Sequence, residues 1–236
     1  MNCQEVLDKL KNLADPDYLA GMTHFAIKTD RALGVSAPRM YKLAKEIGTD
    51  HKLALELWQT RIHEARVIAA IIDDPMQVTK SQMNAWVRQF DNWGVCDACC
   101  CVLFDKTPFA WEKAIEWAGR KEEFVKRAGF VLMAALAVHD KKAPDKKFLP
   151  FFKVIKRHAD DERNFVKKAV NWALRQTGKR NLPLNKKAIV VAKEIQKIDS
   201  SAARWVAADA LRELTSKKVQ ARLPALECRC RGHAAI

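Results

Sequence analysis

Apolar residues recur at intervals of three or four positions along most of the chain, which is the spacing of amphipathic α-helices. The first series is Val6, Leu10 and Leu13. Gly, Pro, Asp, Ser and Thr interrupt the pattern and divide it into separate helices. We expect helices over residues 5–13, 16–25, 39–47, 53–58, 64–72, 81–90, 95–104, 109–117, 122–138, 148–158, 160–175, 184–196, 200–214 and 216–223. No segment alternates convincingly with the period of two that is typical of a strand, so the sequence predicts an all-α protein.

Several of these helices carry start and stop signals. Asp50 and Thr79 precede helices as candidate N-caps, and Ser36 lies two residues before Pro38 in a similar position. Gly48 follows a helix where glycine commonly ends one. These signals indicate short helices joined by short turns.

Four of the predicted helices resemble one another. Each has a basic residue near its start followed by small residues, and the basic positions are Arg66, Arg127, Lys168 and Arg204. Arg127 and Lys168 are 41 residues apart, and Lys168 and Arg204 are 36 apart. Periods near 40 with two helices each are typical of HEAT-type repeats. We therefore expect a right-handed HEAT-like helical-repeat solenoid with a concave basic groove. The alternative for each basic residue is a local role, in which it caps a neighbouring carbonyl or pairs with a glutamate.

The chain is strongly basic, with 42 Lys and Arg against 28 Asp and Glu and a formal net charge of +14. Such an excess favours a polyanionic partner, most commonly nucleic acid, although a merely soluble basic protein is the alternative. Residues 1–223 are predicted to form a single repeat domain, followed by a basic C-terminal tail at 224–236. The N-terminus lacks a signal-peptide layout and no apolar run has the length of a membrane span. We expect a cytoplasmic monomer with no membrane partner.

The seven cysteines are odd in number, and four of them lie between Cys96 and Cys101. Because this is no disulfide framework, it indicates a reducing compartment. A zinc site can be drawn from Cys96-x-x-Cys99 and the Cys and His residues at 228–233. The first pair lies in a predicted helix without the knuckle that zinc sites use, so we expect neither a metal nor a cofactor.

The segment from Phe90 to Asp97 carries the most promising chemistry. Trp93 and Asp97 are four residues apart, so on a helix they project from the same face. An indole ring beside an anionic oxygen could hold a cation. Asp97 leads into an apolar run that predicts a buried helix, where a carboxylate needs a partner or a function. The alternative is that Asp97 caps or pairs locally and Trp93 packs in the core.

Other candidates have structural explanations. His139 and Asp140 are adjacent at a predicted helix end and are interpreted as a capping pair. The sequence lacks a serine-nucleophile elbow, a phosphate-binding glycine loop and a zinc-protease His pair. The remaining tryptophans at helical spacings are expected in the core, namely Trp58, Trp86, Trp111, Trp117 and Trp205.

From about Glu5 to Leu223 the chain resembles the AlkD-like DNA alkylation-repair glycosylases, which are built from HEAT-like repeats. The segments that carry the resemblance are Gly34-Val-Ser-Ala-Pro38, Leu57-Trp58 with Glu64-Ala-Arg66, Asn92-Trp93 with Asp97, Lys126-Arg127-Ala128 and Lys168-Ala-Val-Asn-Trp172-Ala-Leu-Arg175.

The resemblance implies a monofunctional DNA glycosylase of base excision repair. Such an enzyme excises cationic N3- and N7-alkylated purines, such as 3-methyladenine and 7-methylguanine, from double-stranded DNA without flipping the base. By position, Asp97 matches the carboxylate beside the scissile bond, and Trp93 and Trp172 match the two tryptophans that flank the lesion. The arginines of the family that contact the backbone near the lesion match Arg127 and Arg175. The repeat pattern and the matched motifs add Lys168, Arg204, Lys126 and Arg66 as candidate DNA contacts.

One position departs from the family pattern. The best-studied branch has an Asp directly after the tryptophan that matches Trp93, and this chain has Gly94 there. A second branch of the family keeps the fold and lacks excision, so the fold alone does not establish an activity. Two alternatives therefore stay open: a non-catalytic DNA-binding protein of the same fold, and a HEAT-type protein-interaction module.

Overall fold

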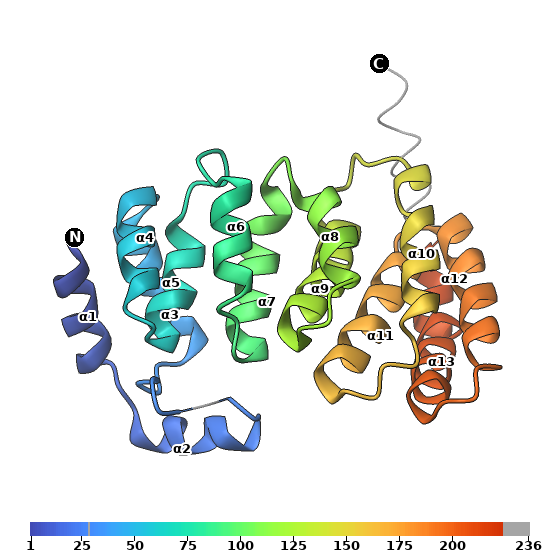
Figure 1. Ribbon diagram of the computed structural model, residues 1–236, viewed down its shortest axis with the longest axis horizontal. Coiled ribbons are helices and arrows are strands. Elements are labelled where there is room, and N and C mark those ends of the chain that lie inside the picture. Colours follow the sequence, from blue (N-terminus) through green and yellow to red (C-terminus); the bar gives the residue numbers. More distant parts are fainter. Residues whose placement is uncertain (28, 224–236) are drawn as a thin grey trace. The chain divides into compact units, whose positions relative to one another are not determined.

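The computed structural model describes residues 1–27 and 29–223, and the predicted tail at 224–236 lies outside the described residues. Throughout the described ranges the regular elements are all helices, which confirms the all-α prediction. The chain divides into two compact units, Met1–Ala110 and the part from Trp111 onward (Figure 1). In the described ranges no helix is both long and apolar enough to cross a bilayer.

The first unit is organised around helix α5. Its elements are α1 (Cys3–Asn12), α2 (Pro16–His24), α3 (Ala37–Ile47), α4 (His51–Gln59), α5 (His63–Ile72), α6 (Lys80–Val87), α7 (Trp93–Val102) and the 3₁₀ turn η1 (Phe104–Lys106). Helix α5 packs against α3, α4 and α7, and nearly all of its residues are buried. Beside it, Trp58 and Trp86 stack with ring centroids 3.9 Å apart, which confirms both as core residues.

The second unit is built on two packed helix pairs. Its elements are α8 (Ala110–Ala118), α9 (Glu123–His139), the 3₁₀ turn η2 (Asp145–Lys147), α10 (Leu149–Arg157), α11 (Asn164–Gly178), α12 (Leu182–Ile195), α13 (Ser201–Leu214) and a further helical segment at 217–223. Helix α9 lies along α11, and α12 lies along α13 (Figure 1). Helix α9 is buried on nearly all sides, as its apolar sequence requires. Trp117 is in this core as predicted.

Two of the predicted N-caps are confirmed by hydrogen bonds from their side chains. The Asp50 side chain accepts a hydrogen bond from the Leu53 N–H at 2.9 Å, and the Thr79 hydroxyl accepts one from the Gln82 N–H at 3.1 Å. Asp140 is the C-cap residue of α9, where its backbone N–H donates to the Leu136 carbonyl, and its side chain accepts a hydrogen bond from the Ala143 N–H in the following loop. Ser36 occupies the N-cap position of α3 but makes no capping hydrogen bond through its side chain.

The connection between α2 and α3 is held by a buried acid to which the sequence analysis gave no structural role. Glu64, in the first turn of α5, is fully buried. Its carboxylate accepts hydrogen bonds from three consecutive backbone N–H groups, at 2.9 Å from Leu33, 2.8 Å from Gly34 and 3.2 Å from Val35. Gly34 has a φ of +78°, a conformation that favours glycine and turns these donors toward one acceptor. The loop is therefore fixed to the central helix of the unit.

Replacing Glu64 by alanine should destabilise the protein strongly, because it leaves buried backbone donors without an acceptor. Each such donor costs about 1–3 kcal/mol, so we expect a loss of roughly 2–5 kcal/mol in the free energy of unfolding measured with urea. Glu46→Ala is the matched control, since Glu46 forms a half-exposed ion pair with Lys9. It should cost less than about 1 kcal/mol. Equal losses in the two variants would contradict this assignment.

Candidate nucleic-acid interface

Helix α7 carries Trp93 and Asp97 on its first turns. The side chain of Asn92 accepts a hydrogen bond from the Val95 N–H at 3.0 Å, so the helix begins at Trp93, two residues earlier than the apolar pattern predicts. Trp93 and Asp97 are partly exposed, whereas Val95 and Cys96 between them are fully buried. The pair therefore lies at the surface of the first unit, and Trp93 is not a core residue.

The indole of Trp93 is anchored to the end of α2. Its Nε1–H donates a hydrogen bond of 2.7 Å to the carbonyl oxygen of Phe25. The connection that follows Phe25 is held in turn by α5, where the His63 N–H donates to the Arg31 carbonyl at 2.8 Å and Glu64 binds three further N–H groups. Because one edge of the ring is fixed in this way, the orientation of Trp93 depends on the loop between α2 and α3.

Gly94 stands in a tight environment. A Cβ atom at this position would lie 3.1 Å from Cε1 of His63 and 3.2 Å from Oδ1 of Asn92, the atom that caps α7. A larger side chain would therefore push against both neighbours. Burial lowers the pKa of His63. This effect is larger than the rise that the nearby carboxylates Glu64 and Asp91 would cause. Position 94 is thus bounded closely by the partly buried imidazole of His63 and by the cap of α7.

Three of the four clustered cysteines lie on the inner side of α7, and Cys101 is partly exposed. Cys96, Cys99 and Cys100 are fully buried and free of disulfides. Burial raises the pKa of the Cys99 and Cys100 thiols well above the ordinary value, so these thiols stay protonated. Within the described ranges no group of His, Cys, Asp or Glu side chains is arranged to hold a metal ion. The second half of the zinc site drawn from the sequence, at 228–233, lies outside those ranges.

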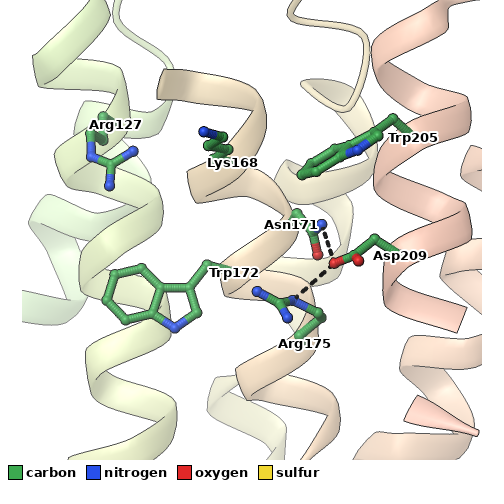
Figure 2. Close-up of a pocket in the computed structure, with 7 residues that line it drawn as sticks. All are labelled: Arg127, Lys168, Asn171, Trp172, Arg175, Trp205 and Asp209. Carbon is green, nitrogen blue, oxygen red and sulfur yellow. Dashed lines mark hydrogen bonds and ion pairs between the residues drawn. The ribbon is translucent and has the colours of Figure 1, made fainter. Parts of the chain in front are cut away.

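The second unit has an open pocket of about 390 Å³ between α9, α11 and α13 (Figure 2). It brings together four of the residues predicted as site residues: Trp172, Arg127, Lys168 and Arg175. The other lining residues are Asn171, Trp205 and Asp209. The pocket therefore combines two indole rings with three cationic side chains and one carboxylate, a composition typical of nucleic-acid contacts.

Arg127 and Lys126 at the start of α9 also have structural partners. The Nη1 atom of Arg127 donates a hydrogen bond of 2.7 Å to the Phe165 carbonyl in α11, and only 6% of the residue is exposed. Lys126 pairs with Asp161 at 3.2 Å. Burial alone would raise the pKa of Asp161, but hydrogen bonds from Arg163 and Lys126 outweigh it and lower the pKa to about 2. Lys126 therefore helps to hold the loop that precedes α11, and Arg127 holds the first turn of α11.

Arg66 fits the local alternative rather than the predicted DNA contact. It is 5% exposed, and its Nη1 donates to the Gln89 carbonyl at 3.3 Å. The guanidinium lies over the Trp58 ring, 5.0 Å from the ring centroid. Burial is the main cause that lowers the pKa of Arg66. The side chain thus binds within the first unit and presents almost no surface to a ligand.

The remaining predicted DNA contacts differ in their exposure and in their ion pairs. Arg175 is partly exposed and is held by Glu213 at 2.5 Å and by Asp209 at 3.6 Å. Arg204 is exposed and pairs with Asp199 at 3.1 Å. Lys168 is exposed at the pocket and forms no ion pair with another residue of the described ranges. Lys168 is therefore the cation of this set that is most available to an incoming anion.

Sequence reasoning missed three residues of the pocket. Trp205 was predicted as core, and this was wrong, since 41% of it is exposed and it lines the pocket. Asn171 and Asp209 were not considered, although Asn171 Nδ2 donates to Asp209 Oδ2 at 2.8 Å (Figure 2). A signal was present in the spacing, because Trp205 and Asp209 are four residues apart, as Trp93 and Asp97 are.

Comparison with known proteins agrees with this architecture. A family model described as DNA alkylation repair enzyme matches residues 6–214. A search of curated proteins found no match.

One solved structure is similar over 91% of this chain and 96% of its own, with a TM-score of 0.76 and 21% sequence identity. It is described as "A new family of proteins related to the HEAT-like repeat DNA glycosylases with affinity for branched DNA structures". At this level of identity the similarity concerns the fold, and it confirms the predicted HEAT-like helical repeats.

The different exposures of Lys168 and Arg66 predict opposite phenotypes in DNA binding. Lys168→Ala should reduce the slope of log Kobs against log salt concentration by about one, because one phosphate contact is lost. Arg66→Ala should leave this slope unchanged and lower the free energy of unfolding instead. Duplex binding measured between about 50 and 200 mM salt distinguishes the two. An unchanged slope in Lys168→Ala, or a flatter one in Arg66→Ala, would contradict the placement of these side chains.

Proposed function

Because the chain belongs to the family of DNA alkylation repair enzymes, we propose that it is a monofunctional DNA glycosylase that excises cationic N3- and N7-alkylated purines. Its partner is double-stranded DNA that contains lesions such as 3-methyladenine or 7-methylguanine. The reaction is hydrolysis of the N-glycosidic bond, which is the first step of base excision repair. No cofactor is required by this chemistry.

The observation that carries the proposal is the Trp93–Asp97 pair on α7. Both side chains reach the surface from a helix whose intervening residues Val95 and Cys96 are buried. The indole is fixed by its hydrogen bond to Phe25. A carboxylate and an anchored ring one turn apart offer a cation both an anionic oxygen and an electron-rich face.

A cationic lesion lowers the demand on the catalyst. When the C1′–N bond breaks, its electron pair leaves with the purine, and an alkylated purine that already carries a positive charge departs as a neutral base. Positive charge develops on the sugar, water adds to C1′, and one proton is released. In the proposed mechanism the Asp97 carboxylate stabilises the sugar cation and orients the water, so a single acid suffices where sugar hydrolases use two.

Trp172 and the basic residues have the supporting roles. Trp172 offers a second ring face to a cationic base. Arg127, Lys168 and Arg175 line the same pocket of the second unit as Trp172, where they supply positive charge to a phosphate backbone. Lys126 and Arg204, at the starts of α9 and α13, add to the positive charge of the unit. Recognition through charge and backbone contacts needs no enclosed base pocket, so base flipping is not part of the proposal.

A second candidate function is structure-specific DNA binding without excision. Gly94 favours this second function. The best-studied branch of the AlkD-like family has an Asp at this position, and here His63 and Asn92 lie close to the place its side chain would take. The fold neighbour is described as related to glycosylases, with affinity for branched DNA. Release of 7-methylguanine from methylated duplex DNA by the purified protein separates the two functions.

Asp97→Asn should lower the rate of 7-methylguanine release by about 100-fold or more while duplex binding stays near that of the wild type. The substitution keeps the shape of the side chain and removes the charge that stabilises the sugar cation. Single-turnover release from methylated DNA and a binding titration on the same duplex provide the two measurements.

Asp17→Asn is the matched control for this variant, since Asp17 is an exposed carboxylate in the first turn of α2. It should release 7-methylguanine at the wild-type rate. Wild-type excision by Asp97→Asn would remove Asp97 from the mechanism, and absence of excision by the unmodified protein would leave the binding function.

The charge of the substrate should decide whether a base is excised. Cationic 7-methylguanine should be released, whereas neutral hypoxanthine and uracil should not, since each tryptophan face attracts a cation by about 0.5–2 kcal/mol and offers a neutral base no such gain. Bulky N7 adducts that remain cationic should also be released, because the base is not enclosed. Efficient removal of uracil, or rejection of bulky cationic adducts, would overturn the proposed basis of selectivity.

A further inference from the structure

Trp205 gives the pocket of the second unit a feature that the proposed excision reaction does not use. It projects from the first turns of α13, on the opposite side of the pocket from Arg127 and Trp172 (Figure 2). The ring is 41% exposed, and the ammonium of Lys167 lies 5.4 Å from its centroid. Lys168 lies at the same pocket. An exposed indole with one ammonium group over its ring and a second lysine at the same pocket has the composition of a stacking platform for a nucleotide.

The floor beside Trp205 is a fixed polar network. Asn171 is 1% exposed, and its Nδ2 donates to Asp209. Asp209 is also paired with Arg175 and Arg212, so its charge is compensated and does not repel an anionic ligand. The Oδ1 atom of Asn171 is buried and accepts no hydrogen bond within the described part of the chain. It lies beneath the accessible surface of the pocket, so Asn171 serves here to fix Asp209.

These contacts select an unpaired nucleotide over a paired one. A base in a continuous duplex is covered on both faces by its neighbours and exposes only its edges in the grooves. A base that has left the stack exposes a full ring face to an aromatic side chain. A volume of about 390 Å³ lies within the range of pockets that hold a small molecule. The pocket is therefore suited to one nucleotide together with its phosphate.

We propose that the Trp205 side of this pocket binds an unpaired nucleotide of a DNA strand, with the base stacked on Trp205 and the phosphate beside Lys168. This inference rests on the proposed function only in taking DNA as the partner, and it does not depend on excision. The protein should therefore recognise a departure from continuous pairing even where no base is alkylated.

The test compares two undamaged duplexes that differ in a single base. One carries a bulged adenosine, and the other carries a bulged abasic residue with the same backbone and charge. The wild-type protein should bind the bulged adenosine about 5- to 100-fold more tightly, as stacking of one base on an aromatic ring requires. Dissociation constants are measured by fluorescence anisotropy of end-labelled DNA.

Three variants locate the effect. Trp205→Ala should bind both duplexes equally, and Trp205→Phe should keep part of the preference because it retains a ring. Tyr41→Ala, which removes an exposed ring from α3 in the first unit, should behave as the wild type. Equal affinity of the wild type for both duplexes, or a full preference in Trp205→Ala, would overturn the proposal.

Excision is measured on the same proteins to keep this result separate from the proposed glycosylase activity. If the proposed activity fails, no protein releases 7-methylguanine, and the preference for the bulged adenosine persists. If the proposal for Trp205 fails, 7-methylguanine release from a paired duplex proceeds and the preference is absent.

Discussion

The first unit depends on a buried acid that has to be satisfied by backbone donors. Glu64 is fully enclosed on α5, and its carboxylate is held by three consecutive N–H groups of the loop before α3. If the loop moved away, the carboxylate would stay among apolar groups without its three hydrogen-bond donors. Since the same connection begins at Phe25, whose carbonyl holds the Trp93 indole, a core constraint on α5 determines how a surface ring on α7 is presented.

The net charge of the chain has two different uses. Arg66 and Arg127 each occupy the repeated basic position, and each donates to a backbone carbonyl farther along the chain, Gln89 and Phe165 respectively. Lys168 occupies the corresponding position in a later helix and is exposed. A basic residue that recurs at the same place in each repeat therefore does not by itself identify a binding surface. In some repeats its side chain is used in packing, and in another it is exposed.

The helices were predictable because each is specified locally, by apolar spacing and by caps such as Asp50 and Thr79. The clamp at Glu64 was not, since it joins residues about 30 positions apart through backbone donors that carry no sequence signature. Trp205 was misassigned for a related reason. Helical spacing places a ring on a face, but whether another helix covers that face is decided by tertiary packing. Residue identity thus singled out Trp93, Asp97 and Trp172 as candidates, while the exposure of their neighbours required the fold.

The burial of the thiols on α7 bears on the survival of the protein itself. The agents that alkylate purine nitrogens are electrophiles, and they also consume thiolates, which are far more nucleophilic than protonated thiols. Cys99 and Cys100 are inaccessible, and burial keeps their pKa well above the ordinary value. They are therefore poor scavengers. The two thiols on the inner face of the helix that bears Trp93 and Asp97 are therefore protected from a methylating agent, and any attack on this helix would fall first on the partly exposed Cys101.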